Sequence, residues 1–220
     1  MTPDQALAEV SGGKLRPVYL VVGEERLLAD QVVKAIHDKA IEGGIEGLND
    51  DALTVPQDKI DLVLATARTL PMLARRRFLL VRGVDKWDSD RPGSAKSAKK
   101  AAAASPLDQL TTLAESPPDT TVLVLRAEKL DKRRRLYTLA KKEGWLVSCE
   151  PLKRAELPGF IAARVVARGC KISRSHADLL AEISGPELSV IADAVERLCL
   201  YVGDGGAIDE GSISELVVKV

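Results

Sequence analysis

Short runs of apolar residues alternate with amphipathic stretches along the first 150 residues of the chain. Each run is short enough for a buried strand, whereas apolar residues in the stretches between recur every three or four positions, as on one face of a helix. We expect strands at residues 17–22, 52–55, 78–81, 121–125 and 145–148. We expect helices at residues 2–12, 28–40, 58–68, 107–115 and 131–142.

Strands that alternate with helices favour parallel βαβ units, in which helices cover both faces of one sheet. After about residue 150 the pattern predicts helices, at residues 156–168, 175–183 and 186–201 and from about 210 onward, with Ser175 in a capping box. The predicted fold class is therefore α/β: a five-stranded parallel sheet domain at residues 1–151, followed by a small helical bundle domain at residues 152–220.

The turn after the first strand has the layout of a nucleotide-binding P-loop without its chemistry. A P-loop needs the pattern G-x-x-x-x-G-K-[ST], in which backbone N–H groups and the Lys meet phosphates and the hydroxyl holds Mg²⁺. The turn here is Gly23-Glu24-Glu25-Arg26-Leu27-Leu28, without the second glycine, the Lys or the hydroxyl. Glu24 and Glu25 stand at the positive end of the predicted helix, where they stabilise the helix and repel a triphosphate.

The ends of two core strands also lack the chemistry of a P-loop ATPase, which needs an acidic pair there to hold Mg²⁺ and polarise water. The strand at 78–81 is followed by Arg82 and the strand at 121–125 by Arg126. ATP hydrolysis by this chain is therefore not expected.

The charge balance excludes a strong general attraction to nucleic acid or to an anionic membrane. Lys and Arg together number 32, as do Asp and Glu. There is neither a run of about 18 apolar residues nor a basic leader, so membrane spanning and secretion are not expected. Residues 88–106 are rich in Ser, Gly, Ala and Lys, and we expect a flexible loop with Lys96, Lys99 and Lys100 solvated.

The cysteines and histidines do not form a catalytic or metal-binding pattern. Cys149, Cys170 and Cys199 are far apart and odd in number, which argues against a disulfide framework or a zinc site and suits a reducing cytoplasm. We expect His37 and His176 to have surface or helix-capping roles. No catalytic, cofactor-binding or metal-binding residue is predicted.

Several short motifs, taken in order, carry a resemblance to a known family. They are Pro17-Val18-Tyr19-Leu20, Gly23-Glu24-Glu25, Leu27-Leu28, Leu70-Pro71-Met72-Leu73, Phe78–Val81, Leu130-Asp131-Lys132-Arg133, Leu157-Pro158, Glu196-Arg197-Leu198 and Leu200-Tyr201. Over nearly the whole chain they resemble the delta subunits of bacterial DNA polymerase III, the clamp-loader subunits that open the sliding clamp.

The resemblance implies an AAA+-like first domain without a functional nucleotide site, a small helical second domain, and a third, collar domain that joins the other clamp-loader subunits. It implies a cytoplasmic subunit of a DNA-directed DNA polymerase holoenzyme, with no catalytic site or cofactor of its own. Such a subunit binds the sliding clamp (the beta subunit) and opens the ring for loading on primed DNA. The sequence ends at Val220, about where the collar would begin, so we expect a truncated chain.

In the resembled family, two large apolar residues at the tip of the first domain fill a hydrophobic pocket on the clamp. The matching residues here are Met72 and Leu73. Pro71 disfavours helical geometry at Leu70 and so favours a short bend, and Met is an adaptable apolar side chain. The family usually has an aromatic residue at one of the two positions, so weaker binding is expected here. Alternatively, both side chains pack beneath the sheet.

Two dense runs of basic residues suggest further contacts. The first is Arg75, Arg76 and Arg77, and the second is Lys132, Arg133, Arg134 and Arg135. The first run would keep the apolar pair soluble and meet acidic groups around the pocket of the clamp. Either run could touch duplex phosphates or be a solvated surface. Only 3% of residues are aromatic, which argues against recognition of single strands by stacking.

Two other classes of function remain open at this point. One is a divergent, nucleotide-dependent P-loop ATPase, for which binding of nucleotide with Mg²⁺ would be diagnostic. The other is a DNA-binding module that uses the arginine runs, for which salt-dependent binding of duplex without any clamp would be diagnostic.

Overall fold

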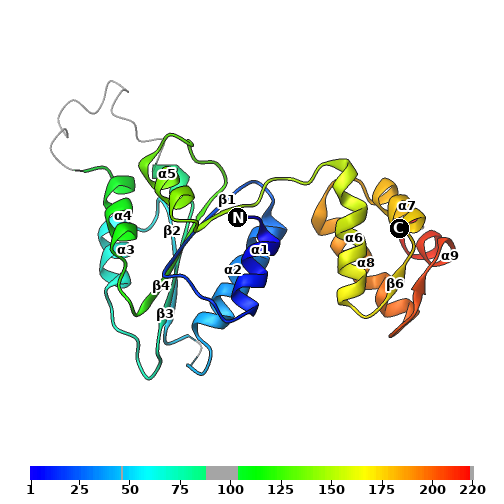
Figure 1. The fold of residues 1–220 in the computed structure, drawn as a ribbon, viewed down its shortest axis with the longest axis horizontal. Helices are drawn as coiled ribbons and strands as arrows, with labels where there is room; N and C mark the ends of the chain where they lie inside the picture. The colour runs from blue at the N-terminus through cyan, green and yellow to red at the C-terminus, as the bar shows by residue number, and fades with distance from the viewer. Residues whose placement is uncertain (46, 88–103, 219–220) are drawn as a thin grey trace. The chain divides into compact units, whose positions relative to one another are not determined.

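The computed structural model describes residues 1–45, 47–87 and 104–218, and the chain divides into two compact units, Met1–Glu150 and Pro151–Val220 (Figure 1). Most of the loop predicted at residues 88–106, with Lys96, Lys99 and Lys100, lies outside the described residues. No helix within the described ranges has both the length and the apolar character needed to cross a membrane.

The first unit is built on the parallel sheet that the sequence predicts. Its strands are β1 (Val18–Val22), β2 (Asp50–Thr54), β3 (Arg77–Arg82), β4 (Thr121–Ala127) and β5 (Leu146–Ser148). They lie in the order β2-β3-β4-β1-β5, and every neighbouring pair is parallel. The predicted five-stranded parallel sheet is confirmed. Because β4 is longer than expected, Arg126 lies within the strand and not after it.

Helices cover both faces of this sheet (Figure 1). They are α1 (Pro3–Ser11), α2 (Arg26–Ala40), α3 (Ile60–Ala67), α4 (Pro106–Glu115) and α5 (Arg135–Lys142), with a 3₁₀ turn η1 (Val84–Trp87) after β3. Helices α1 and α2 lie on one face and α3, α4 and α5 on the other. The main core lies between the sheet and the second group, and β1 is buried along its whole length.

Helix α5 begins four residues later than the predicted start at Asp131. The carboxylate of Asp131 accepts a hydrogen bond from the backbone N–H of Arg133 at 2.9 Å, and its carbonyl accepts one from the N–H of Arg134 at 2.9 Å. An Asp side chain that bonds its own backbone two residues on makes a turn, which competes with helix formation. The basic run therefore lies in the turn and at the start of the helix.

The second unit is helical with one feature that the sequence did not predict. Its elements are η2 (Arg154–Glu156), α6 (Leu157–Ala167), β6 (Lys171–Ile172), α7 (Arg174–Ser184), α8 (Leu188–Val202), β7 (Ala207–Ile208), α9 (Glu210–Ile213) and a π-helical turn η3 (Ser214–Val218). The two-residue strands β6 and β7 pair in parallel. The predicted cap at Ser175 is wrong, because the Ser173 side chain accepts from the N–H of His176 and caps α7.

Candidate functional site

The turn after β1 is closed by the chain's own backbone. Gly23 has φ +143°, and a Cβ built there would lie 2.0 Å from the carbonyl oxygen of Cys149. The N–H of Gly23 donates to the carbonyl of Ala127 at 3.2 Å, and the N–H of Glu25 donates to the carbonyl of Cys149 at 3.0 Å. In a P-loop such amides face phosphate, whereas here protein carbonyls accept from them.

The side chains around this turn make it still less suited to an anion. Glu25 is the N-cap of α2, and its carboxylate accepts from the N–H of Leu27 at 3.0 Å. Glu24 forms an ion pair with Lys129, whose pKa is raised by that contact. The Arg126 guanidinium donates to the carbonyl of Gly23 at 3.0 Å. An arginine thus supports the turn from the strand where an ATPase would place an acid.

A shallow groove of about 590 Å³ lies beside α2 on the same unit. Its charged lining consists of Asp30, Asp50, Asp51, Lys34, Arg82 and Arg126, together with His37. Three carboxylates and three permanent cations give this lining no net preference for a phosphate group. The groove therefore offers a phosphate group no net positive charge.

The loop between α3 and β3 exposes three large apolar side chains. Leu70 is 71% exposed, Met72 58% and Leu73 84%. We name residues 70–74 the apolar tip. The tip precedes β3 and the phosphate-like turn follows β1. Because the strands are parallel, the tip lies at their amino ends and the turn at their carboxyl ends. The alternative that Met72 and Leu73 pack beneath the sheet is wrong.

The apolar tip is held in place by a buried residue that the sequence analysis missed. Asn49 is completely buried, and its side-chain Nδ2 donates to the carbonyl of Met72 at 2.8 Å. The N–H of Met72 donates back to the Oδ1 of Asn49 at 2.6 Å. The next residue, Leu73, has φ +53°, in the left-handed region that costs a non-glycine residue about 1–2 kcal/mol. The surroundings therefore impose the shape of the tip.

The three arginines after the tip are placed differently from one another. Arg75 is exposed and Arg76 half-buried. Arg77 opens β3, and its Nη2 and Nε lie 2.6 and 2.8 Å from the same carboxylate oxygen of Asp51. Arg77 therefore ties β3 to β2, and Arg75 is the best placed of the three to meet a partner.

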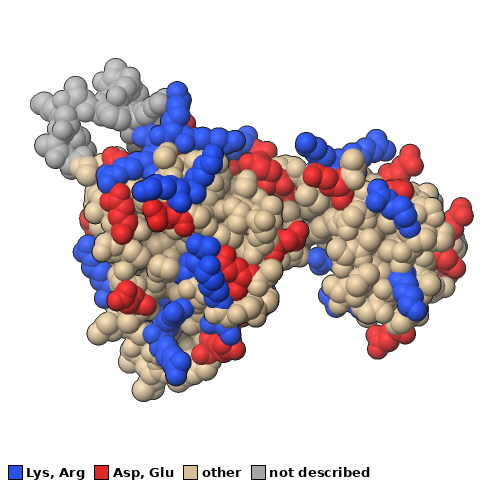
Figure 2. All heavy atoms as spheres, viewed as in Figure 1, with Lys and Arg blue, Asp and Glu red and all other residues tan. Residues whose placement is uncertain are grey.

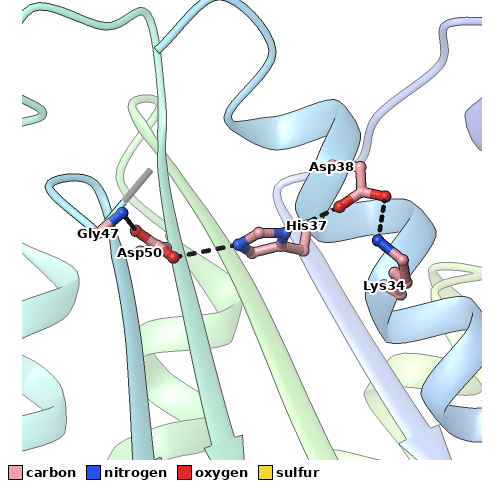
Figure 3. Close-up of polar contacts among 5 residues, drawn as sticks. All are labelled: Lys34, His37, Asp38, Gly47 and Asp50. Carbon is pink, nitrogen blue, oxygen red and sulfur yellow. Dashed lines mark hydrogen bonds and ion pairs between the residues drawn. The ribbon is translucent and has the colours of Figure 1, made fainter. Parts of the chain in front are cut away.

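A network of polar groups fixes the connection between α2 and β2 (Figure 3), and the first residue of β2, Asp50, directly follows Asn49 in the chain. His37 lies between Asp38, at 3.1 Å, and Asp50, at 3.2 Å, and its ring stands edge-on to Phe78. The other carboxylate oxygen of Asp50 accepts from the N–H of Gly47 at 2.6 Å. The expectation of a plain surface or capping role for His37 is wrong, because this side chain joins a helix to a strand.

We expect the substitution His37→Gln to remove a pH-dependent part of the stability of the first unit. Burial lowers the pKa of His37, but hydrogen bonds to Asp38 and Asp50 outweigh burial and raise it overall. The contribution is then complete below the unfolded pKa, about 6.5, and is lost as the pH rises through the folded pKa. Urea unfolding should show a difference between wild type and variant that shrinks toward alkaline pH. It should stay below about 1 kcal/mol because the pairs are partly exposed, and a pH-independent difference would contradict this account.

Arg133 and Arg135 of the second basic run are paired with acidic side chains. Two nitrogens of the Arg133 guanidinium bond Asp131 at 3.1 and 3.0 Å, and Arg135 lies 2.6 Å from Glu115. Figure 2 shows Lys and Arg side chains gathered over the end of the first unit that carries α5, interspersed with acids. A phosphate would compete with these carboxylates.

The order of the sheet, the turn after β1 and the helical unit that follows define an AAA+-like α/β protein. The family model described as DNA polymerase III, delta subunit, matches residues 19–150. The chain therefore belongs to the DNA polymerase III delta subunit family.

Curated relatives agree with this assignment. The chain is 25% identical over 209 residues to DNA polymerase III subunit delta of Bacillus subtilis, covering 94% of this chain and 58% of that protein. It is 25% identical over 206 residues to the Escherichia coli subunit, covering 92% of this chain and 55% of that protein. The chain thus spans little more than half the length of these relatives.

Among solved structures, the Bacillus subtilis DNA clamp loader delta protein superposes with a TM-score of 0.78 at 24% identity, over 98% of this chain and 62% of that one. A Thermotoga maritima RuvB mutant superposes with a TM-score of 0.54 at 13% identity, over 98% of this chain and 67% of that one. At these identities the likeness concerns the fold.

Proposed function

We propose that this chain binds the sliding clamp of a bacterial replicase through the apolar tip, and that this binding opens the ring for loading on primed DNA. The observation that carries the proposal is the exposure of Leu70, Met72 and Leu73 on one supported loop. Large apolar side chains exposed together mark sites of protein contact. Membership of the delta subunit family supports the sliding clamp as the partner.

The energy available from the tip suits a transient contact. Burying Met72 and Leu73 in a pocket would contribute roughly 3–6 kcal/mol of gross transfer energy, from which the cost of association is subtracted. Arg75, exposed beside them, would meet acidic groups at the rim and raise the rate of encounter. Binding at a subunit interface of the ring would favour a distorted surface and so weaken the ring.

In this proposal the chain has no nucleotide chemistry of its own. The amides of the turn after β1 are engaged by the carbonyls of Ala127 and Cys149, and Glu24 and Glu25 flank them. ATP bound in neighbouring subunits would control when the tip is exposed. In the longer relatives, contacts with those subunits would lie in the parts that this chain does not span.

The test is a calorimetric titration of the purified cognate sliding clamp with this chain. In a second experiment, ATP with Mg²⁺ is titrated into the chain. Saturable binding of the clamp and no saturable binding of ATP are expected. Absence of clamp binding would overturn the proposal. Saturable ATP binding would favour the ATPase alternative, and salt-dependent duplex binding without clamp would favour the DNA-binding module.

A further inference from the structure

The side chain of Asn49, the residue just before the edge strand β2, connects the apolar tip to the sheet. This residue is anchored at both ends: its backbone carbonyl accepts from the N–H of Phe78, in β3, at 2.8 Å. Its carboxamide makes one donated and one accepted hydrogen bond with the backbone of Met72. Because the amide is planar, this pair of bonds fixes both the position and the direction of the chain at Met72. A buried residue thus sets the placement of exposed ones.

The segment that carries Asn49 is itself fixed against the tip. The polar network of His37, Asp50 and Gly47 holds the start of β2 (Figure 3). A Cβ built on Gly44 would lie 3.3 Å from the Cβ of Ala74, so the connection between α2 and β2 packs closely on the base of the tip. The support therefore reaches from α2 through β2 to the exposed loop.

We infer that Asn49 is a positioning residue for clamp binding, which holds Met72 and Leu73 in the binding conformation before the clamp arrives. The inference rests on the proposed function. Leu73 occupies the left-handed region, which a free leucine rarely visits. Without the bonds from Asn49, the loop spends most of its time in other conformations. The apparent affinity then falls by the fraction of molecules that remain competent to bind.

The first test is the substitution Asn49→Ala in the full 220-residue chain. We expect clamp binding to weaken about tenfold, which corresponds to loss of the competent conformation in nine molecules of ten. Hydrogen exchange at the N–H of Met72 should accelerate in the free protein. The matched control is Thr111→Val, which removes another buried side-chain hydrogen bond, to Leu107 at 2.7 Å within α4, and should leave binding unchanged. Circular dichroism establishes the folded fraction of each variant.

The second test uses Asn49→Asp, whose side chain has the shape of the native amide. When neutral, the carboxyl group accepts from the N–H of Met72 and donates to its carbonyl, as asparagine does. When ionised, it repels that carbonyl. Burial raises the pKa of the introduced carboxyl group, so clamp binding relative to wild type should recover as the pH falls from about 8 to about 5.5. A side chain that only stabilised the fold would show no such recovery once the folded fraction is accounted for.

The outcomes separate this inference from the proposed function. If folded Asn49→Ala binds the clamp as wild type does, while loss of Met72 and Leu73 abolishes binding, the positioning role is overturned and the proposed function stands. If loss of Met72 and Leu73 has no effect either, the proposed function falls. An Asn49→Asp variant that stays weak at every pH would also count against the positioning role.

Discussion

The double substitution Met72→Ala and Leu73→Ser is expected to abolish binding of the chain to the sliding clamp while the fold persists. Both side chains are mostly exposed, so their loss removes little buried area from the folded chain. In the complex they would supply roughly 3–6 kcal/mol of gross apolar burial. Losing even the lower figure weakens binding by more than about a hundredfold. Calorimetric titration of the clamp measures the loss, and thermal unfolding checks the fold.

The matched control for this variant is Leu200→Ser. Leu200 is 75% exposed on α8 in the second unit, so it resembles Leu73 in exposure but belongs to another surface. Clamp binding should be unchanged in the control. Undiminished binding by the double variant, with the control also binding, would show that the apolar tip is not the contact.

The sheet was predictable from the sequence because its central strands are continuous apolar runs. The strands at 78–81 and 121–125 are buried on both faces, and such strands leave a strong local signal. The predicted strand at 52–55 begins two residues after the start of β2, because β2 is an edge strand that starts with the partly exposed Asp50 and Asp51. The pair β6 and β7 has only two residues on each side, too few for any period.

The candidate site was predictable only in part, and for a physical reason. The resemblance to the delta subunits marked Met72 and Leu73 as candidates, because they belong to a short local motif, Leu70-Pro71-Met72-Leu73. The role of Asn49 depends on contacts with a residue 23 positions later. An asparagine before a strand is common in turns, so nothing local separates a buried support from a turn residue. The same holds for His37, whose partner Asp50 lies 13 residues away.

Gly23 keeps the position of a P-loop glycine although the residues that bind phosphate are missing from the turn. If this glycine were retained for phosphate binding, a small side chain there would chiefly affect nucleotide affinity. The structure gives a different reason for a glycine. The residue has φ +143°, and the carbonyl carbon and oxygen of Cys149 occupy the space where a Cβ would lie. The glycine is required by close packing of two backbone segments.

The substitution Gly23→Ala is therefore expected to destabilise the first unit severely in the absence of any nucleotide. A Cβ 2.0 Å from a backbone oxygen forces β1 and the segment after β5 apart, and it breaks the hydrogen bond from Glu25 to Cys149. We expect a loss of at least about 4 kcal/mol, which is a large part of the stability of a typical domain. The melting temperature measured by circular dichroism should fall by about 8–16 °C or more, or the variant should fail to fold.

The matched control is Gly13→Ala, which separates the clash from the backbone conformation. Gly13 also has a positive φ, +84°, but among the described residues no heavy atom lies within 4 Å of a Cβ built there. This variant has only the cost of the left-handed conformation, about 1–2 kcal/mol. If Gly23→Ala melted no lower than Gly13→Ala, the close approach of Cys149 would not be what requires the glycine. A bound ligand would then be the better explanation for a glycine at this position.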